Sequence, residues 1–463
     1  MAHFDVHLRG GLVLLPDQPE PVAAEIGIIA GQIAAIAPEL TDTAADTLDA
    51  TGLVILPGGV DAHVHFNEPG RSAWEGWATG TRALAAGGVT CCIEMPLNAS
   101  PPTLDAASLH AKLAAARASA YVDFALWGGL TPANLDTLDE LAAGGVIGFK
   151  AFMCDSGISD FQAADEDTLH TGMRHAARLG LPVAVHAEHE PTVSQLTAQA
   201  RASGATSIRA YRASRPIHAE QEAIQLAAHL AQETGCRLHV VHVSSGQGVQ
   251  AVLAAQARGV DISCETCPHY LVLTDADVEQ LGAVAKCAPP IRSAAVQAEL
   301  WAYLADGRLP MVASDHSPAP PDMKTAPDFF AVWGGISGCQ ATLPLLLDAG
   351  YHQRGIPLAT LARAWATYPA QRFGLGQRKG QIAIGYDADL VLVDLVAQTT
   401  VQASNLFYRH PHSPYIGRTL RGVVVQTLVR GVGVYQRGQI VGQGGWGAWV
   451  AGGVASRATL QHT

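Results

Sequence analysis

The sequence lacks any uncharged apolar stretch of the ~18 residues that a membrane-spanning helix needs. Its first ten residues, MAHFDVHLRG, also lack the basic and apolar regions of a secretory signal. No block of like charges occurs, although 41 acidic residues outnumber 29 basic ones and give a net charge of −12. These absences argue against a membrane protein and against nucleic acid or an anionic membrane as a partner. We therefore expect a cytoplasmic protein.

The sequence has no paired-cysteine framework. Its eight cysteines are scattered, mostly inside apolar runs such as VTCCIEM, so we expect reduced thiols. Cys264 and Cys267 form a CxxC motif, but no second pair accompanies it, as a structural zinc site usually requires. We interpret both as strand cysteines rather than zinc ligands.

Apolar residues are abundant, at 48 % of the chain, and they occur in two sequence patterns. The first fifty-odd residues and the stretch from about 371 to 445 contain short strand-like runs broken by turns, as in EIGIIAGQIAAIA and KGQIAIGYDADLVLVDL. Between them, apolar runs alternate with Ala/Leu-rich helical stretches such as AEQEAIQLAAHLAQETG, which is typical of βαβ units.

The middle region contains eight strand-like runs: GLVILPGGVDAHVHF, GVTCCIEM, YVDFALWGG, GVIGFKAF, LPVAVHAE, RLHVVHVS, VDISCETCP and PMVASDHSP. Eight strand–helix repeats predict a (β/α)8 TIM barrel of α/β class over residues 57–370. The flanks, 1–56 and 371–445, would form one small β-sandwich from both chain ends. We interpret residues 446–463, rich in Gly and Ala, as a loosely held C-terminal tail.

An HxH motif, His63 and His65, ends the first of these runs. Side chains at i and i+2 of a strand share one face, so both imidazoles would project together near the mouth of the barrel, where active sites of this architecture lie. Such a pair by itself is more often structural than metal-binding.

Other runs also end in ionisable residues, namely Lys150, His186, His242 and Asp315. Unpartnered buried charge is costly, so this repeated placement is hard to explain as packing. Four histidines and a carboxylate at one mouth predict a binuclear metal site, with Zn²⁺ favoured and Mn²⁺, Co²⁺ or Fe²⁺ as alternatives.

Lys150 needs its own explanation, because an ammonium repels cations. Burial and two nearby metal ions would favour its neutral amine, which can capture CO₂ and become a bridging carbamate. The alternative is a core lysine that reaches a carboxylate.

Two metals can activate a shared hydroxide at neutral pH. Asp315 would bind one metal, accept the hydroxide proton, and deliver it to a departing nitrogen. We therefore predict an enzyme that carries out metal-assisted hydrolysis of an amide-like C–N bond. Its substrate would be a small molecule.

Several further polar residues near the mouth have open roles. We interpret His239 as packed on the opposite strand face, His316 as no more than a neighbour of the ligands, and His189 and His269 as weaker candidates. Glu94 and Glu188 would either orient ligands or be solvated loop carboxylates, and the latter is favoured. The Pro-rich segment 318–335 is a candidate lid.

At these residues the chain resembles the cyclic amidohydrolases, the family of dihydroorotases, hydantoinases or dihydropyrimidinases, and allantoinases. The similarity covers nearly the whole chain. Its specific stretches are DAHVHFNEPGRSAWEGWATGTRALAAGGVT, EMPLN, GFKAFM, YRASRP, HVSSGQGV, CETCPHY, KCAPPIR, SDHSPAPPDMK, WGGISG and RHPHSPYIGRTL. SDHSPAPPDMK and WGGISG make it most similar to the allantoinase branch.

The resemblance implies that the metal ligands are His63, His65, Lys150 as N6-carboxylysine, His186, His242 and Asp315, with Asp315 also the acid/base. It implies ring opening of allantoin to allantoate, in purine degradation, by a homotetramer.

Local residues bear on the substrate. Dihydroorotases usually carry an Arg two residues after the HxH motif to hold a substrate carboxylate, whereas this chain has Asn67, which suits a neutral ureide. Arg71 is an alternative clamp. Backbone groups near Ala288 and Gly334 are suited to the amide edges of a ureide, with Trp333 beside them. Ser317 either faces the substrate or caps a turn.

Two other classes of function stay open at this point. Another cyclic amidohydrolase activity, on hydantoins, dihydropyrimidines or dihydroorotate, is the main alternative. A non-catalytic scaffold on the same fold is remote, because such scaffolds typically lose ligands and this chain keeps all six.

Overall fold

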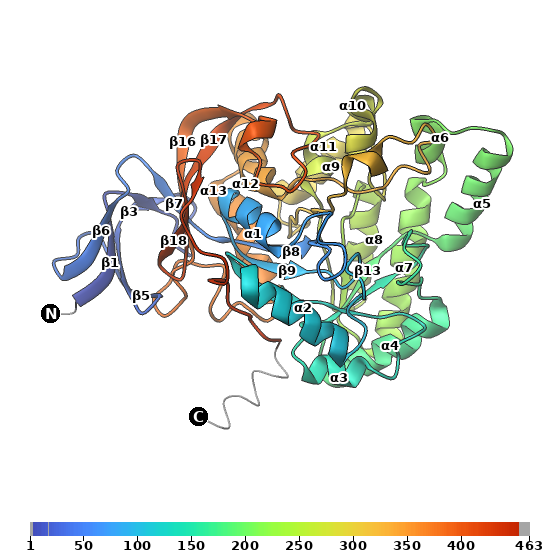
Figure 1. Ribbon diagram of the computed structural model, residues 1–463, viewed down its shortest axis with the longest axis horizontal. Coiled ribbons are helices and arrows are strands. Elements are labelled where there is room, and N and C mark those ends of the chain that lie inside the picture. The colour runs from blue at the N-terminus through green and yellow to red at the C-terminus, as the bar shows by residue number, and fades with distance from the viewer. Residues whose placement is uncertain (1–2, 17, 453–463) are drawn as a thin grey trace.

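The computed structural model describes residues 3–16 and 18–452 (Figure 1). Strands from both chain ends lie together at the left of Figure 1, and the alternating strands and helices of the middle region lie to the right. Among these described residues, no helix is both long and apolar enough to cross a membrane.

The middle region is built from parallel strands, which confirms the predicted α/β class. A three-stranded sheet has the order β10-β9-β8 and a five-stranded sheet the order β11-β12-β13-β14-β15. The bounds are β8 (Gly59–Val64), β9 (Val89–Glu94), β10 (Asp123–Leu126), β11 (Gly128–Gly129), β12 (Phe149–Phe152), β13 (Val183–His186), β14 (Leu238–Val240) and β15 (Ile262–Cys264).

The eighth predicted run, residues 310–318, differs from a regular strand. It makes isolated parallel bridges, Thr266 with Val312 and Val64 with His316, rather than a continuous ladder. The Asp61 carboxylate accepts hydrogen bonds from the amides of Ser314 (3.0 Å) and His63 (3.3 Å). A side chain therefore fastens this segment to β8 where ladder bonds are missing.

Helices follow the strands along the chain and cover them. They are α1 (Trp77–Ala86), α2 (Ala106–Ser119), α3 (Leu138–Ala143), α4 (Glu166–Leu179), α5 (Glu190–Ala202), α6 (Ile208–Ala213), α7 (Ile217–Thr234), α8 (Gly246–Ala257), α9 (Pro268–Val272), α10 (Asp275–Leu281), α11 (Ala294–Ala305), α12 (Thr342–Leu345), α13 (Leu358–Ala362) and α14 (Tyr368–Arg372). Short 3₁₀ segments are η1 (Gly282–Ala285), η2 (Pro321–Lys324), η3 (Cys339–Ala341) and η6 (Ala403–Asn405), and π segments are η4 (Leu346–His352) and η5 (Arg363–Thr367).

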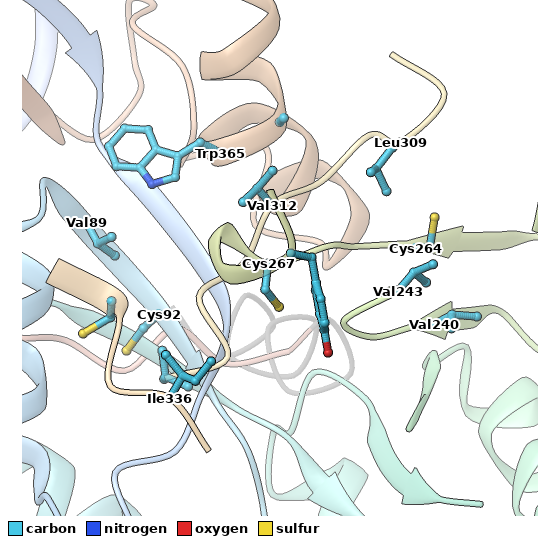
Figure 2. Packing of buried hydrophobic residues seen from close by; sticks show 14 of the residues in the cluster. Val89, Cys92, Val240, Val243, Cys264, Cys267, Leu309, Val312, Ile336 and Trp365 are labelled. Carbon is cyan, nitrogen blue, oxygen red and sulfur yellow. The ribbon is translucent and has the colours of Figure 1, made fainter. Parts of the chain in front are cut away.

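Apolar side chains fill the space between strands and helices (Figure 2). Trp365 packs so closely on the start of β8 that a Cβ added at Gly59 would lie 2.3 Å from its ring. Cys92, Cys264 and Cys267 belong to this core, and all eight cysteines are buried free thiols. Cys264 lies in β15 and Cys267 directly precedes α9, so only the first of the pair is a strand residue.

The chain ends form two further sheets. One has the order β5-β4-β1-β6 and the other β19-β18-β17-β16-β7-β2-β3. The strands are β1 (His3–Arg9), β2 (Leu12–Val13), β3 (Val22–Ala23), β4 (Glu25–Ile29), β5 (Gln32–Ala37), β6 (Thr43–Asp49), β7 (Val54–Pro57), β16 (Leu390–Thr400), β17 (Thr419–Val429), β18 (Val432–Gln436) and β19 (Gln439–Ile440). Apolar side chains of both sheets share one buried cluster, including Ile26, Ile55 and Leu392.

An ion cluster joins these sheets to the parallel strands. The Lys379 ammonium lies 2.5 Å from Asp123, at the start of β10, 2.7 Å from Asp389 and 2.9 Å from Asp387, and all four side chains are almost fully buried. Arg430 also pairs with Asp123. Since Asp123 opens its strand, the cluster lies at the end opposite to the strand-end residues predicted to bind metal.

The described part of the predicted tail is not loose. The Phe124 amide donates to the Ala448 carbonyl (3.0 Å), and the Val450 amide donates back to the Phe124 carbonyl (2.8 Å). Gly452 similarly donates to Gly145. Residues 446–452 therefore extend along β10, and residues 453–463 of the predicted tail lie outside the described part of the chain.

Candidate metal centre

The six residues predicted as metal ligands come together at one end of the parallel strands. His63 lies in β8, Lys150 in β12, and His186 is the last residue of β13. His65 and His242 lie just beyond the ends of β8 and β14, and Asp315 lies in the irregular segment 310–318. All six are buried. Parallel strands in register bring their carboxyl ends to one edge, which explains why residues so distant in sequence meet.

His63, His65 and Asp315 form the first group. The two Nε2 atoms are 3.3 Å apart, and Asp315 Oδ1 lies 3.2 Å from Nε2 of His63 and 3.5 Å from Nε2 of His65. Ligands about 2.1 Å from a tetrahedral zinc ion are roughly 3.4 Å from one another. The three atoms thus have the spacing of ligands on one divalent ion.

His186 and His242 form a second group beside the first. His186 Nδ1 lies 2.9 Å from His242 Nε2, and the ring centroids of His242 and His63 are 5.5 Å apart. The two ring nitrogens are therefore within hydrogen-bond distance of each other, beside the first group.

Lys150 is fully buried, and its Nζ has no hydrogen-bond partner within residues 3–16 and 18–452. Burial lowers the pKa of its ammonium to about 7, although Glu265 and Asp315 oppose that shift. An unpaired ammonium is costly in this environment, whereas an anionic group on Nζ that bound cations would be satisfied. The residue fits a carboxylated lysine better than a salt-bridged core lysine.

The protonation states suit metal binding. Burial lowers the pKa of His65 to about 4, and also lowers the pKa values of His186 and His242, so these imidazoles are neutral at pH 7. Burial alone would raise the pKa of Asp315, but its contacts with His63 and His65 hold that pKa well below its usual range. Neutral imidazoles and an ionised carboxylate are the forms that bind divalent ions.

The backbone is strained at two of these residues. His242 has φ +40° and Asp315 has φ +45°, in the left-handed region that non-glycine residues rarely adopt. Such strain persists where surrounding structure enforces it and is concentrated at functional sites.

Two buried carboxylates orient the histidines. Glu265 accepts from Nδ1 of His63 (2.6 Å) and Nε2 of His239 (3.0 Å), which leaves Nε2 of His63 free to face the cluster. Glu188 contacts Nε2 of His186 (2.8 Å) and Arg215, so Nδ1 is the ring nitrogen of His186 that faces His242. Carboxylates that fix the tautomer of a ligating histidine are a regular feature of metal sites.

Sequence reasoning missed Glu265 and wrongly favoured a solvated Glu188. Glu265 closes the seventh apolar run, at the position equivalent to the other strand-end residues, so the signal was present. Glu94 is also buried rather than solvated: it pairs with Lys112 (2.5 Å) and accepts from the Phe66 amide, and neither partner is one of the six residues.

The other histidines take separate positions. His239 is packed and bonded to Ser263 and Glu265, as expected. His316 accepts from the Gly338 amide, and His189 contacts Thr192 at the start of α5. His269 is buried near Asp315, and neither of its ring nitrogens has a partner in the described part of the chain.

The cluster opens into a cavity of about 360 Å³. Of the residues predicted to contact substrate, Ala288, Ser317, Trp333 and Gly334 line it. Asn67 does not: it is fully buried and its amide donates to the Pro318 carbonyl (3.3 Å). Arg71 is not a cavity clamp either, because its guanidinium binds Asp160 and the carbonyls of Asn98 and Ala99.

This fold and this donor set are those of a metal-dependent hydrolase, and the sequence agrees. The model of the amidohydrolase family matches residues 54–434, and the chain belongs to that family. It is 54 % identical to the allantoinase of Rubrobacter xylanophilus, over 95 % of this chain and 96 % of that protein, and 52 % identical to that of Solibacter usitatus, over 95 % of each. Among solved structures it resembles the L-hydantoinase (dihydropyrimidinase) of Arthrobacter aurescens, with 35 % identity, a TM-score of 0.94, and coverage of 97 % of this chain and 100 % of that one.

Proposed function

We propose that the protein is an allantoinase, which hydrolyses the cyclic amide bond of allantoin to give allantoate in purine degradation. The observation that carries this proposal is the 54 % sequence identity between this protein and an allantoinase, over nearly the full length of both chains. The identity to the L-hydantoinase is 35 %. Neither Asn67 nor Arg71, the two positions considered for a carboxylate clamp, lines the cavity.

We propose two metal positions. His63, His65 and Asp315 would hold one ion, and His186 and His242 the other, with carboxylated Lys150 between them. Nitrogen and oxygen donors favour Zn²⁺, with Co²⁺, Mn²⁺ or Fe²⁺ as alternatives. When bound, such a pair supplies an activated water and polarises the substrate carbonyl.

The protein's own contribution to the reaction is proton transfer and positioning. Asp315, held as a carboxylate, would take the proton of the attacking water on its side-chain oxygen. As the new C–O bond forms and the ring C–N bond breaks, Asp315 would return that proton to the departing nitrogen. Glu265 and Glu188 keep His63 and His186 in the tautomers that face the cluster.

The cavity wall would bind the rest of the substrate. Backbone groups at Ala288 and Gly334 would pair with the amide edges of the ureide, beside Ser317 and Trp333. Asn67 would act only indirectly, by fixing the loop that carries Pro318.

We further propose that residues 57–370 form a closed (β/α)8 barrel, and that residues 1–56 and 371–445 form one sandwich, with 446–463 as a C-terminal segment. The bridges from Thr266 to Val312 and from Val64 to His316 support closure between β15 and β8. By family resemblance the assembly would be a cytoplasmic homotetramer, and the free thiols suit a reducing compartment.

Hydantoinase activity is the second candidate, favoured by the TM-score of 0.94. Turnover of allantoin, hydantoin, dihydrouracil and dihydroorotate by the metal-loaded protein separates the candidates. The proposal expects the highest kcat/KM on allantoin. A higher value on hydantoin or dihydrouracil would reassign the enzyme.

A further inference from the structure

One wall of the cavity is an irregular segment, residues 329–335. Six of its residues, Phe330 to Gly335, line the cavity, and none belongs to a helix or strand. Backbone groups in such a segment need partners, because burying an unpaired carbonyl is costly.

The first source of partners is Lys286, which is 4 % exposed. Its ammonium donates to the carbonyls of Phe329 (2.6 Å), Phe330 (3.2 Å) and Val332. It also lies 4.5 Å from the centre of the Tyr211 ring. None of these partners of Lys286 is a carboxylate. The ammonium interacts instead with main-chain oxygens and with the face of an aromatic ring.

The second source is Lys324, at the end of η2. Its ammonium donates to the carbonyls of Trp333 (2.9 Å) and Gly335 (2.7 Å). The Gly335 amide in turn donates to the Lys286 carbonyl (2.8 Å). Two lysines thus bind the carbonyls of residues 329, 330, 332, 333 and 335, which turns those oxygens toward the ammonium groups.

Gly334 lies between the carbonyls that Lys324 holds. A Cβ added there would meet nothing within 4 Å, whereas a Cβ added at Gly335 would lie 2.2 Å from the Ser317 carbonyl. Gly335 is pressed against the segment that carries Asp315, and Gly334 faces open space in the cavity lining. The hydrogen bonds of the lysines and this close contact together fix the orientation of the Gly334 backbone toward the cavity.

We propose that Lys286 and Lys324 are positioning residues that hold segment 329–335 as a preformed wall for the ureide, and that substrate affinity depends on them. The inference rests on the proposed function. Preformed sites bind more tightly because the ordering cost is met before binding. The hydrogen bonds of both lysines go to main-chain carbonyls and to none of the six proposed ligands, so we expect the effect on binding rather than on the chemical step.

Lys286→Met tests this, with steady-state kinetics on allantoin and metal analysis. We expect a rise in KM of about tenfold or more with kcat within about threefold, and unchanged metal content. Lys286→Arg, which keeps a cation that can donate to carbonyls, should recover most of the affinity. The double variant Lys286→Met/Lys324→Met should show a total rise in KM, relative to the parent protein, that is smaller than the product of the two single rises. This is because both lysines hold one segment.

Lys379→Met is the matched control, since Lys379 is an equally buried lysine with three oxygen partners at the opposite end of the strands. It should leave KM unchanged. Chymotrypsin cleavage at Phe329 and Phe330 gives a readout without turnover, and should be faster in Lys286→Met and Lys324→Met than in the parent protein.

An unchanged KM in both lysine variants, or equal KM shifts in Lys379→Met, would overturn the inference. Should Lys286→Met not fold, Lys324→Met alone decides it by the same criteria. If the parent protein prefers hydantoin to allantoin, the proposed function fails, and the same comparison of variants on hydantoin still tests the lysines.

Discussion

At the scale of single residues, the clustering of the six proposed ligands was predictable, because each of them lies at or just after an apolar run. His63, His186 and Asp315 each follow apolar residues in the sequence, and the cost of burying an ionisable group there makes each a candidate without coordinates. What depends on distant contacts was not predictable. Glu188 is buried because Arg215, far along the chain, pairs with it, and no local pattern reports that pairing.

Lys150→Ala should lose both metal and activity, because it removes the side chain that we propose bridges the two groups of proposed ligands. Incubation with a short carboxylic acid and divalent metal should restore part of the activity, because the acid would replace the carbamate oxygens. Metal analysis and allantoin turnover measure this. Full activity in the unsupplemented variant would remove the carbamate from the mechanism.

Glu265→Gln should weaken metal binding by about 10–100-fold, because an amide cannot accept from both His63 and His239. Competition with a chelator measures the affinity. Glu94→Gln is the matched control: Glu94 is equally buried, but its polar partners are Lys112 and the Phe66 amide rather than a proposed ligand, so its variant should bind metal as the parent does. Equal affinities in all three proteins would show that Glu265 does not orient His63.

At the scale of elements, apolar periodicity located the strands but not their detail. The run over 121–129 is interrupted at Trp127, and β10 and β11 pair with different neighbours. The eighth run is not a regular strand, because the left-handed backbone at Asp315 interrupts the extended conformation. The Asp61 side chain there accepts the hydrogen bond of the Ser314 amide in place of a main-chain carbonyl. Both departures arise from contacts across the fold, which period-two alternation does not encode.

The start of α2 gives a test at this scale. Asp105 accepts from the Ser108 amide (2.7 Å) in a capping box, so Asp105→Ala should lower stability by about 1 kcal/mol, measured by urea unfolding. Asp105→Asn, which keeps an acceptor, should lose much less. An Ala variant as stable as the parent would show that the cap contributes nothing.

The same cap predicts a pH dependence. Hydrogen bonds from Ser108 lower the pKa of Asp105 below its usual 3.8 in the folded protein. A lowered folded pKa stabilises the protein above pH 3.8, and that contribution is lost as pH falls through the folded pKa. The stability difference between the parent and Asp105→Ala should therefore shrink below pH 3.8. A constant difference down to pH 2 would contradict it.

At the scale of the whole molecule, the two β-rich flanks were predicted to combine because their sequence patterns match. Their attachment to the parallel strands was not predictable, since Lys379 meets Asp123 and Asp389 from separate regions of the chain. Likewise, the Gly/Ala-rich composition of residues 446–452 concealed their main-chain bonds to β10.

Lys379→Met should destabilise the protein by about 3 kcal/mol, because it leaves buried carboxylates without their cation. Urea unfolding measures this. Burial alone would lower the pKa of Lys379, but Asp389 and Asp387 outweigh burial and raise it. A raised folded pKa means that the contribution persists from neutral pH up to the ordinary lysine pKa of 10.5, and is lost only as pH rises through the folded value. Equal midpoints at pH 7 would show that the cluster adds no stability.

The pairing of β7 with β16 has a consequence for synthesis. Residues 54–57 pair with residues 390–393. The apolar strand β7 is therefore synthesised long before β16, its partner on that edge. Throughout most of translation that edge is open to any other exposed strand, including one on a neighbouring ribosome. A message truncated before codon 390 would therefore yield an aggregating fragment rather than a smaller enzyme.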